Sequence, residues 1–79
     1  MTTLKTRDVA TAAFLVCRGN RIVETTLEGR DVILHFLLTP QLDSDIAEWK
    51  YGEAMVPARD FTSSRTYVLR LIHDAARQL

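Results

Sequence analysis

Apolar and polar residues alternate in two short stretches on either side of Gly29, and this pattern predicts a β-hairpin over residues 21–38. With Gly29 and Arg30 at the central turn positions, the glycine supplies the positive φ that a type I′ or II′ turn needs. A slip of one residue would move the apolar side chains to the opposite face, so burial should hold this register. The predicted pairs begin with Glu28 opposite Asp31 beside the turn. They continue along both arms to Glu24 opposite His35, Val23 opposite Phe36 and Ile22 opposite Leu37.

This register gives the hairpin one apolar face and one mixed face, because side chains along a strand alternate between faces. The core face is expected to carry Val23, Leu27, Val32, Leu34, Phe36 and Leu38. The opposite face is expected to carry Glu24, Thr26, His35, Ile22, Ile33 and Leu37. That mixed face is too apolar for full exposure and too polar for a second core, so we expect something to cover part of it.

Helical spacing predicts a first helix before the hairpin, with Thr6 as its N-cap and Gly19 as its stop signal. Its core-facing residues are expected to be Val9, Ala12, Ala13, Val16 and Cys17. Leu15 falls on the polar side of the helical wheel, so it is the apolar residue most expected to remain for a partner. A singly exposed leucine is also common and needs no partner.

Two further helices are predicted after the hairpin. Thr39 and Pro40 have the residue types of an N-cap and first helical position, and Gly52 ends this second helix, whose buried stripe is Leu42, Ile46 and Trp49. Residues 53–59 can add a short third edge strand, since Pro57 excludes a central position. Asp60 or Thr62 is then expected to cap a last helix with an apolar face of Phe61, Val68, Leu69, Ile72, Ala75, Ala76 and Leu79.

This order of elements predicts a single α+β domain over residues 1–79, with two layers: a small antiparallel sheet packed with three helices. A chain of 79 residues with 47% apolar content has room for one core. Such a chain buries only roughly 60 to 65% of the surface that its unfolded form exposes. Its stability alone should be marginal, and self-association would relieve this.

Charge and cysteine content narrow the classes of function. Ten basic and ten acidic residues cancel, so no net field draws the whole molecule onto a polyanion. Among the basic residues only Lys5 and Lys50 are lysine; arginine suits phosphate and carboxylate contacts, but its high usage also follows from genome composition. Cys17 is the single cysteine, so we expect no disulfide framework and a reducing, cytoplasmic location. The apolar run at residues 9–17 is too short to span a bilayer and lacks the features of a signal peptide, so no membrane partner is expected.

Arg65 is a candidate contact residue because it is predicted to project from the middle of the apolar face of the last helix, where an unpaired charge is costly. Its guanidinium can reach water, pair with Glu48 or Asp45 of the second helix, or contact a ligand or partner. The hydroxyls and arginines at residues 59–65 also form a plausible anion site at a helix start, although Asp60 would repel an anion and such hydroxyls are often ordinary caps.

Glu24 and His35, directly opposite each other, are the one pair with the residue types of acid–base chemistry. Cross-strand ion pairs on half-exposed sheets are much more common than catalytic dyads. His73 and Cys17 have no partner at ligand spacing, and no Gly-rich phosphate loop or nucleophile motif is present. We therefore predict no catalytic residue, no metal, no cofactor and no enzymatic activity.

The helix leading into Gly19, the hairpin ending in HFLL, the capped acidic helix and the VPARDF stretch before the last helix resemble a family of small bacterial and phage-associated proteins of unknown function. The resemblance covers nearly the whole chain, and it is carried by fold signals. It implies a compact cytoplasmic domain, from a mobile element, and it implies no functional residue.

The leading functional hypothesis is a non-enzymatic interaction or accessory protein that self-associates, as a dimer, or binds another protein. Its interface is expected on the mixed sheet face at Ile22, Ile33 and Leu37, with Leu15 as a further contact. The alternative is a nucleic-acid-associated protein that uses Arg59, Arg65, Arg70 and Arg77. A third class, a small enzyme using Glu24 and His35, would need a concave pocket beside that pair.

Overall fold

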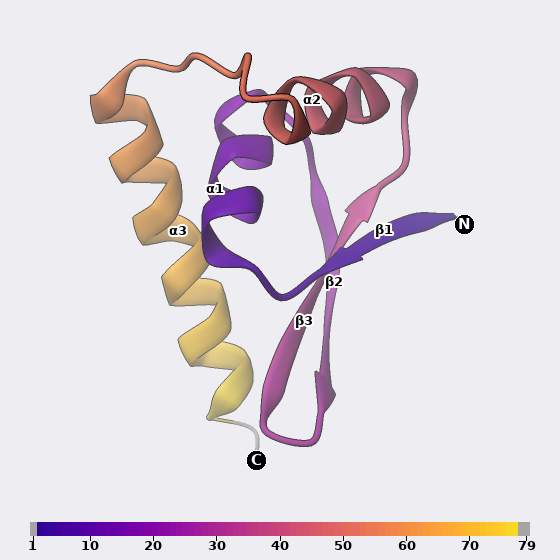
Figure 1. Ribbon diagram of the computed structural model, residues 1–79. Coiled ribbons are helices and arrows are strands. Elements are labelled where there is room, and N and C mark those ends of the chain that lie inside the picture. Colours follow the sequence, from indigo (N-terminus) through magenta and orange to yellow (C-terminus); the bar gives the residue numbers. More distant parts are fainter. Residues whose placement is uncertain (1, 78–79) are drawn as a thin grey trace.

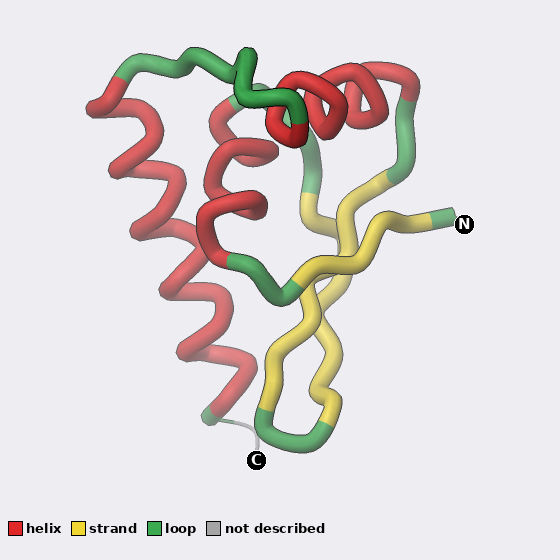
Figure 2. The backbone as a smooth tube through the Cα atoms, viewed as in Figure 1, coloured by secondary structure: helices red, strands yellow, loops and turns green. Residues whose placement is uncertain are grey.

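Three helices cover one face of a three-stranded antiparallel sheet in the computed structural model, which describes residues 2–77 (Figures 1 and 2). The elements in chain order are β1 (Thr3–Thr6), α1 (Val9–Cys17), β2 (Ile22–Glu28), β3 (Asp31–Leu37), α2 (Pro40–Lys50) and α3 (Ala58–Ala76). The strand order is β1-β3-β2, so β3 is central and both β1 and β2 are edge strands. The predicted two-layer α+β fold is confirmed. Leu79, predicted to extend the apolar face of the last helix, lies outside the described residues.

The hairpin register is confirmed through most of its length. Glu28 pairs with Asp31, Glu24 pairs with His35, and Gly29 adopts a φ of 63° in the turn. Glycine has no Cβ to clash at positive φ, which is why the turn can close there.

A β-bulge between Ile22 and Glu24 changes the register at the far end of the hairpin. Phe36 pairs with Ile22 and not with Val23 as predicted, because the bulge inserts one extra residue into β2. Ile22 consequently packs against the core, whereas Val23 is 39% exposed. Leu38, also predicted to face the core, is exposed because it lies beyond the end of β3.

The third strand comes from the beginning of the chain. Thr3–Thr6 pair with β3, with Leu4 opposite Phe36 and Lys5 opposite His35, whereas the predicted strand within residues 53–59 is absent. β3 has β2 on one side, so its other edge was free to accept β1. Leu4 packs against the core, and this gives a reason for the polar stretch at the start of the chain to become a strand.

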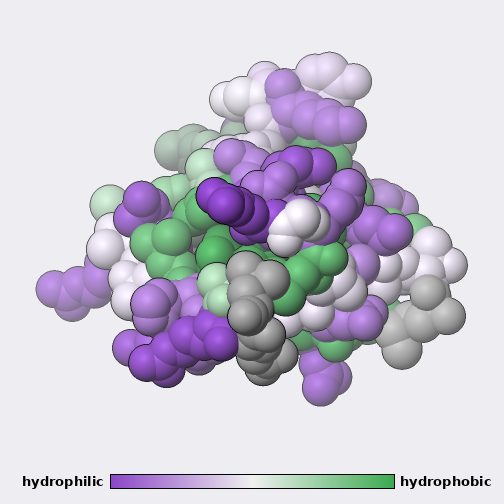
Figure 3. All heavy atoms as spheres, turned by 90° about the horizontal axis from the view of Figure 1, so that it is seen from below, coloured by the Kyte–Doolittle hydropathy of each residue, from purple (hydrophilic) through white to green (hydrophobic). Residues whose placement is uncertain are grey.

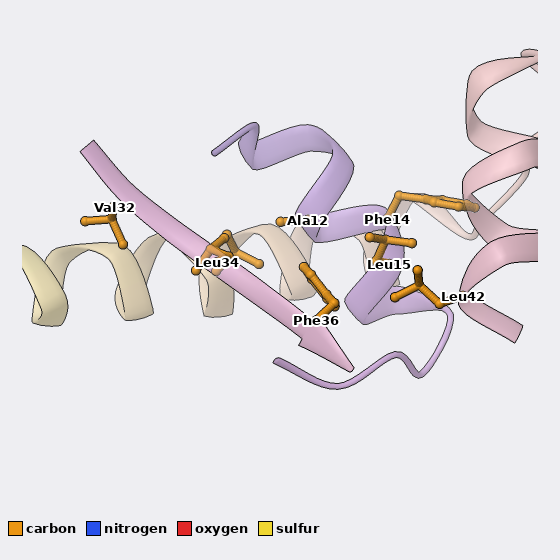
Figure 4. Packing of buried hydrophobic residues seen from close by; sticks show 8 residues of the cluster. Ala12, Phe14, Leu15, Val32, Leu34, Phe36 and Leu42 are labelled. Atoms are coloured by element: carbon orange, nitrogen blue, oxygen red, sulfur yellow. The ribbon is translucent and has the colours of Figure 1, made fainter. Parts of the chain in front are cut away.

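The core lies between β3 and α1 and is closed by α2 and α3. One cluster of buried residues contains Ala12, Phe14 and Leu15 of α1, Val32, Leu34 and Phe36 of β3, Leu42 of α2 and Val68 of α3 (Figure 4). Because α1 contacts other elements on more than one side, all of its apolar residues are buried or half-buried. The prediction that Leu15 remains available for a partner is wrong, since its side chain is 0% exposed.

The predicted N-cap holds for α2 and fails for the other two helices, whereas the predicted stop of the first helix at Gly19 is confirmed, since α1 ends at Cys17 and Gly19 has a φ of 88°. Thr39 caps α2 through a hydrogen bond from the Leu42 N–H. Asp8, not Thr6, caps α1, and hydrogen bonds from the Thr11 hydroxyl and backbone N–H hold the pKa of its carboxyl below the usual value. α3 begins directly after Pro57 without a side-chain cap, so neither Asp60 nor Thr62 has the predicted role.

We expect Leu15→Ala to lower the free energy of unfolding by about 2–5 kcal/mol, because it would leave a cavity where α1 meets the rest of the core. The matched control is Leu69→Ala, a leucine on α3 that is 38% exposed, with an expected change within about 1 kcal/mol. Urea unfolding monitored by circular dichroism measures both. Equal changes for the two variants would contradict the central position of Leu15.

Candidate interaction surface

The face of the sheet opposite the helices is largely polar. Its central strand presents Ile33, His35 and Leu37, and its outer strands present Lys5, Glu24 and Thr26, as the register requires. Ile33 is buried by its neighbours and Leu37 is half-buried, although both were predicted to be available for an interface. With Ile22 and Leu15 packed against the core, this face has less free apolar area than the sequence predicts.

His35 is held within this face by a threonine. Its side chain is 7% exposed, and its Nε2 lies 2.7 Å from Oγ1 of Thr26. Glu24 lies opposite His35 as predicted, but within residues 2–77 no hydrogen bond or ion pair joins the two side chains. The His35 ring therefore contacts the Thr26 hydroxyl on the neighbouring strand and forms no pair with Glu24.

The sheet has two outer edges, on β1 and on β2, and the edge of β2 is the longer one, with seven residues against four. The residues on either side of a two-residue turn direct their N–H and C=O groups at each other, so the groups of Glu28 and of Thr26 face β3. The N–H and C=O groups of Leu27 and Thr25, which alternate with them along the strand, therefore point away from β3. Among the described residues, no further strand pairs with this edge.

Two apolar side chains accompany these backbone groups. Val23 is 39% exposed and Leu27 is 38% exposed, on the same strand. The sequence predicted both residues to face the core, and sequence patterns gave no signal for their exposure because it depends on the bulge and on β2 being an edge strand. Leu27 lies next to the hairpin turn, and the end of the molecule that carries this turn shows apolar side chains in the middle of a hydrophilic surround (Figure 3).

A polar network joins the end of α1 to α2. The Arg18 guanidinium lies 2.8 Å from Oε2 of Glu48 and 3.3 Å from Oδ1 of Asp45. Asp45 is 3% exposed, and its other oxygen accepts a hydrogen bond of 2.8 Å from the Asn20 amide. The predicted partners of Arg65 are therefore paired with Arg18, and Arg65 itself is exposed.

Trp49 strengthens the same junction. Its ring stacks on Phe14 with centroids 5.0 Å apart, and its Nε1 donates a hydrogen bond of 2.9 Å to the Thr11 hydroxyl. The Arg18 guanidinium lies 5.5 Å from the centroid of the Phe14 ring, which adds a cation–π contact. These contacts occupy the polar groups of the junction with one another, so they hold α2 in place and do not form an open site.

The arginines of the C-terminal helix are exposed. Arg59, Arg70 and Arg77 are spaced 11 and 7 residues apart, about three and two turns at about 3.6 residues per turn, so they share one stripe. Arg65 lies away from that stripe. Arg77 approaches Asp74 at 4.0 Å. The Thr62 hydroxyl donates to the Ala58 carbonyl, so it is not available for the predicted anion site.

Two open pockets are present among the described residues, and neither is lined by Glu24 or His35. One is lined by Val16, Gly19, Asn20, Arg21, Ile22 and Tyr67, and the other by Lys5, Thr6, Arg7, Glu28 and Ile33. Among the described residues, no group of three His, Cys, Asp or Glu side chains could hold a metal ion. Within residues 2–77, no helix has both the length and the apolar character needed to cross a bilayer.

Comparisons with protein families, curated proteins and solved structures gave no match to this chain. The resemblance to small phage-associated proteins therefore stays a prediction. The exposed features of the structure itself have to carry the functional argument.

We expect Arg18→Ala to lower the free energy of unfolding by about 1–3 kcal/mol, because it removes the cation that faces the buried Asp45 carboxylate. The control is Arg65→Ala, for which we expect a change within about 0.5 kcal/mol because Arg65 is exposed and lies outside the network. Thermal and urea unfolding of both variants test this. A larger loss for Arg65→Ala would mean that the predicted pairing of Arg65 with α2 is the important one.

Proposed function

We propose that this protein is a non-enzymatic interaction module that self-associates through the free edge of β2. The observation that carries the proposal is the combination of an unpaired strand edge with two exposed apolar residues, Val23 and Leu27, on that same strand. An exposed edge is a template for another strand, and native proteins usually protect it with charge, proline or a covering element. Here a bulge and two glutamates protect it only in part.

The mixed sheet face supports the proposal less strongly. Of the residues first considered for an interface, Leu15 and Ile33 are buried, and Ile22 and Leu37 are half-buried, with Ile22 packed against the core. Pairing at the β2 edge would leave this polar face accessible. It would also add buried area to a small domain whose own core is limited in size.

The expected association is weak. Full burial of a valine or leucine side chain stabilises by about 1.5–3 kcal/mol, and Val23 and Leu27 are already more than half buried in the single chain. Association also costs an estimated 4–15 kcal/mol of translational and rotational freedom. Backbone hydrogen bonds and four partly exposed side chains are therefore consistent with a dissociation constant in the micromolar range, on the order of 1–100 µM.

Val23→Lys and Leu27→Lys should each abolish self-association, because a charged side chain on an edge strand opposes strand pairing. Sedimentation velocity from about 1 µM to about 1 mM, a range that includes the expected dissociation constant, should give a mean mass that rises toward twice the mass of one chain for the unchanged protein. Both variants should keep the mass of one chain. Leu69→Lys, which changes an equally exposed leucine on α3, is the matched control and should leave the association intact. A single-chain mass for the unchanged protein throughout this range would overturn the proposal.

A second candidate function is nucleic-acid binding, favoured by the exposed stripe of Arg59, Arg70 and Arg77 on α3. Contacts from these arginines to phosphates would give an affinity that falls steeply with salt. Zero formal net charge opposes this function, because it provides no overall attraction to a polyanion.

For nucleic-acid binding, a double variant Arg59→Ala and Arg70→Ala is expected to weaken binding to a generic duplex and to reduce its salt dependence, whereas Arg65→Ala, off the stripe, should have less effect. Fluorescence anisotropy with a labelled duplex and a labelled single strand measures both. Phosphate contacts are strongest at low salt, about 50 mM. If the unchanged protein does not bind either nucleic acid under this condition, nucleic-acid binding is ruled out.

A further inference from the structure

We propose that two copies of this chain pair their β2 strands antiparallel about a two-fold axis through Thr25, which joins the two three-stranded sheets into one sheet of six strands. This inference rests on the proposed self-association and adds its register and symmetry. Three independent features of β2 lead to it: the backbone groups at its edge, the spacing of its apolar residues and the positions of its glutamates.

The backbone groups allow the pairing. Thr25 and Leu27 direct their N–H and C=O groups away from β3, because Glu28 and every second residue before it face β3. A two-fold axis at Thr25 therefore brings two residues with outward groups face to face, and they can exchange both hydrogen bonds. The regular pairing of β2 with β3 is left unchanged.

The apolar residues select the register. β2 contains seven residues, Ile22–Glu28, and Thr25 is the central one. Antiparallel pairing about Thr25 places Val23 of one copy opposite Leu27 of the other, and the symmetry repeats this pair on the other side of the axis. Both exposed apolar residues of the strand are thus covered, and the bulge between Ile22 and Glu24 lies near the ends of the paired region, away from the axis.

The glutamates oppose the neighbouring registers. An axis at Glu24 would place the two copies of this carboxylate directly opposite each other. An axis at Thr26 would place Glu24 opposite Glu28 twice. Like charges at directly opposed positions destabilise a strand pair. The axis at Thr25 instead places Glu24 opposite Thr26 and Glu28 opposite Ile22, and each neighbouring register would also engage fewer strand residues.

The arrangement also fits the layers of the fold. The axis runs perpendicular to the sheet, so the helices of both copies lie on one face of the joined sheet and the polar faces form a continuous opposite surface. The hairpin turn of one copy then comes beside Arg21 of the other, next to the pocket lined by Gly19, Asn20 and Ile22.

Cysteine cross-linking tests the register. In a Cys17→Ala background, three variants carry a single cysteine: Glu24→Cys, Thr25→Cys and Thr26→Cys. Only Thr25 faces its own copy across the axis, at a Cα separation of about 5.5 Å, whereas residues 24 and 26 lie about 7–8 Å from their own copies. A disulfide needs Cα atoms within about 7 Å. Mild oxidation should therefore cross-link Thr25→Cys at least about fivefold faster than the other two.

A mixture of the Glu24→Cys and Thr26→Cys proteins controls for cysteine reactivity, because these residues face each other in the proposed register. The mixture should form a mixed disulfide readily. Circular dichroism and sedimentation of the reduced variants establish that each is folded and associates as the unchanged protein does.

Preferential self-cross-linking at residue 24 or 26 would overturn the proposed register and leave self-association through β2 standing. The same holds for slow cross-linking in every variant and in the mixture while sedimentation still gives an association that Val23→Lys abolishes. A single-chain mass in sedimentation would instead overturn the proposed function, and the register with it.

Discussion

The burial of α1 on several sides is the constraint on which the other elements depend. Ala12, Phe14 and Leu15 contact a core that also includes residues of β3, α2 and α3. A nine-residue helix cannot bury its apolar side chains against the sheet alone, so the two later helices have to pack around it. The small side chains of Ala12 and Ala13 permit the close approach of α3, and the bulk of Phe14 is matched by the Trp49 ring.

The polar junction between α1 and α2 follows from this arrangement. When α2 packs beside the end of α1, the Asp45 carboxylate becomes buried and needs charge and hydrogen-bond partners. Arg18 supplies the opposite charge and Asn20 supplies a hydrogen bond, and both residues lie just after the end of α1. Among the described residues, no buried side-chain polar atom lacks a hydrogen-bond partner, so this junction has no group left over for a ligand.

Local signals predicted the parts of the structure that depend on neighbouring residues. Gly29 in the hairpin turn, Thr39 with Pro40 at the start of α2 and the pairs from Glu24 to Glu28 were all predictable, since each depends on local backbone geometry and side-chain alternation. The burial of Leu15 was not predictable in this way, because a helical wheel assumes that only one face of a helix is buried, whereas α1 is buried on several sides. Arg18 as the partner of Asp45 was also missed, because the choice between Arg18 and Arg65 depends on which helix lies beside α2.

The candidate surface was the part least accessible to sequence reasoning, and the reason is the strand order. The alternation of apolar and polar residues placed Val23 and Leu27 among the apolar positions of the hairpin. It contains no information on whether a strand is central in the sheet or at its edge. Once β1 occupies the free side of β3, β2 becomes an edge strand, and the bulge between Ile22 and Glu24 turns Ile22 toward the core in place of Val23. The same apolar residues that predicted a closed core therefore become exposed along a strand with unpaired backbone groups. A covering element in the chain itself would remove the argument for association, but the described helices lie on the face of the sheet and leave this edge without a paired strand.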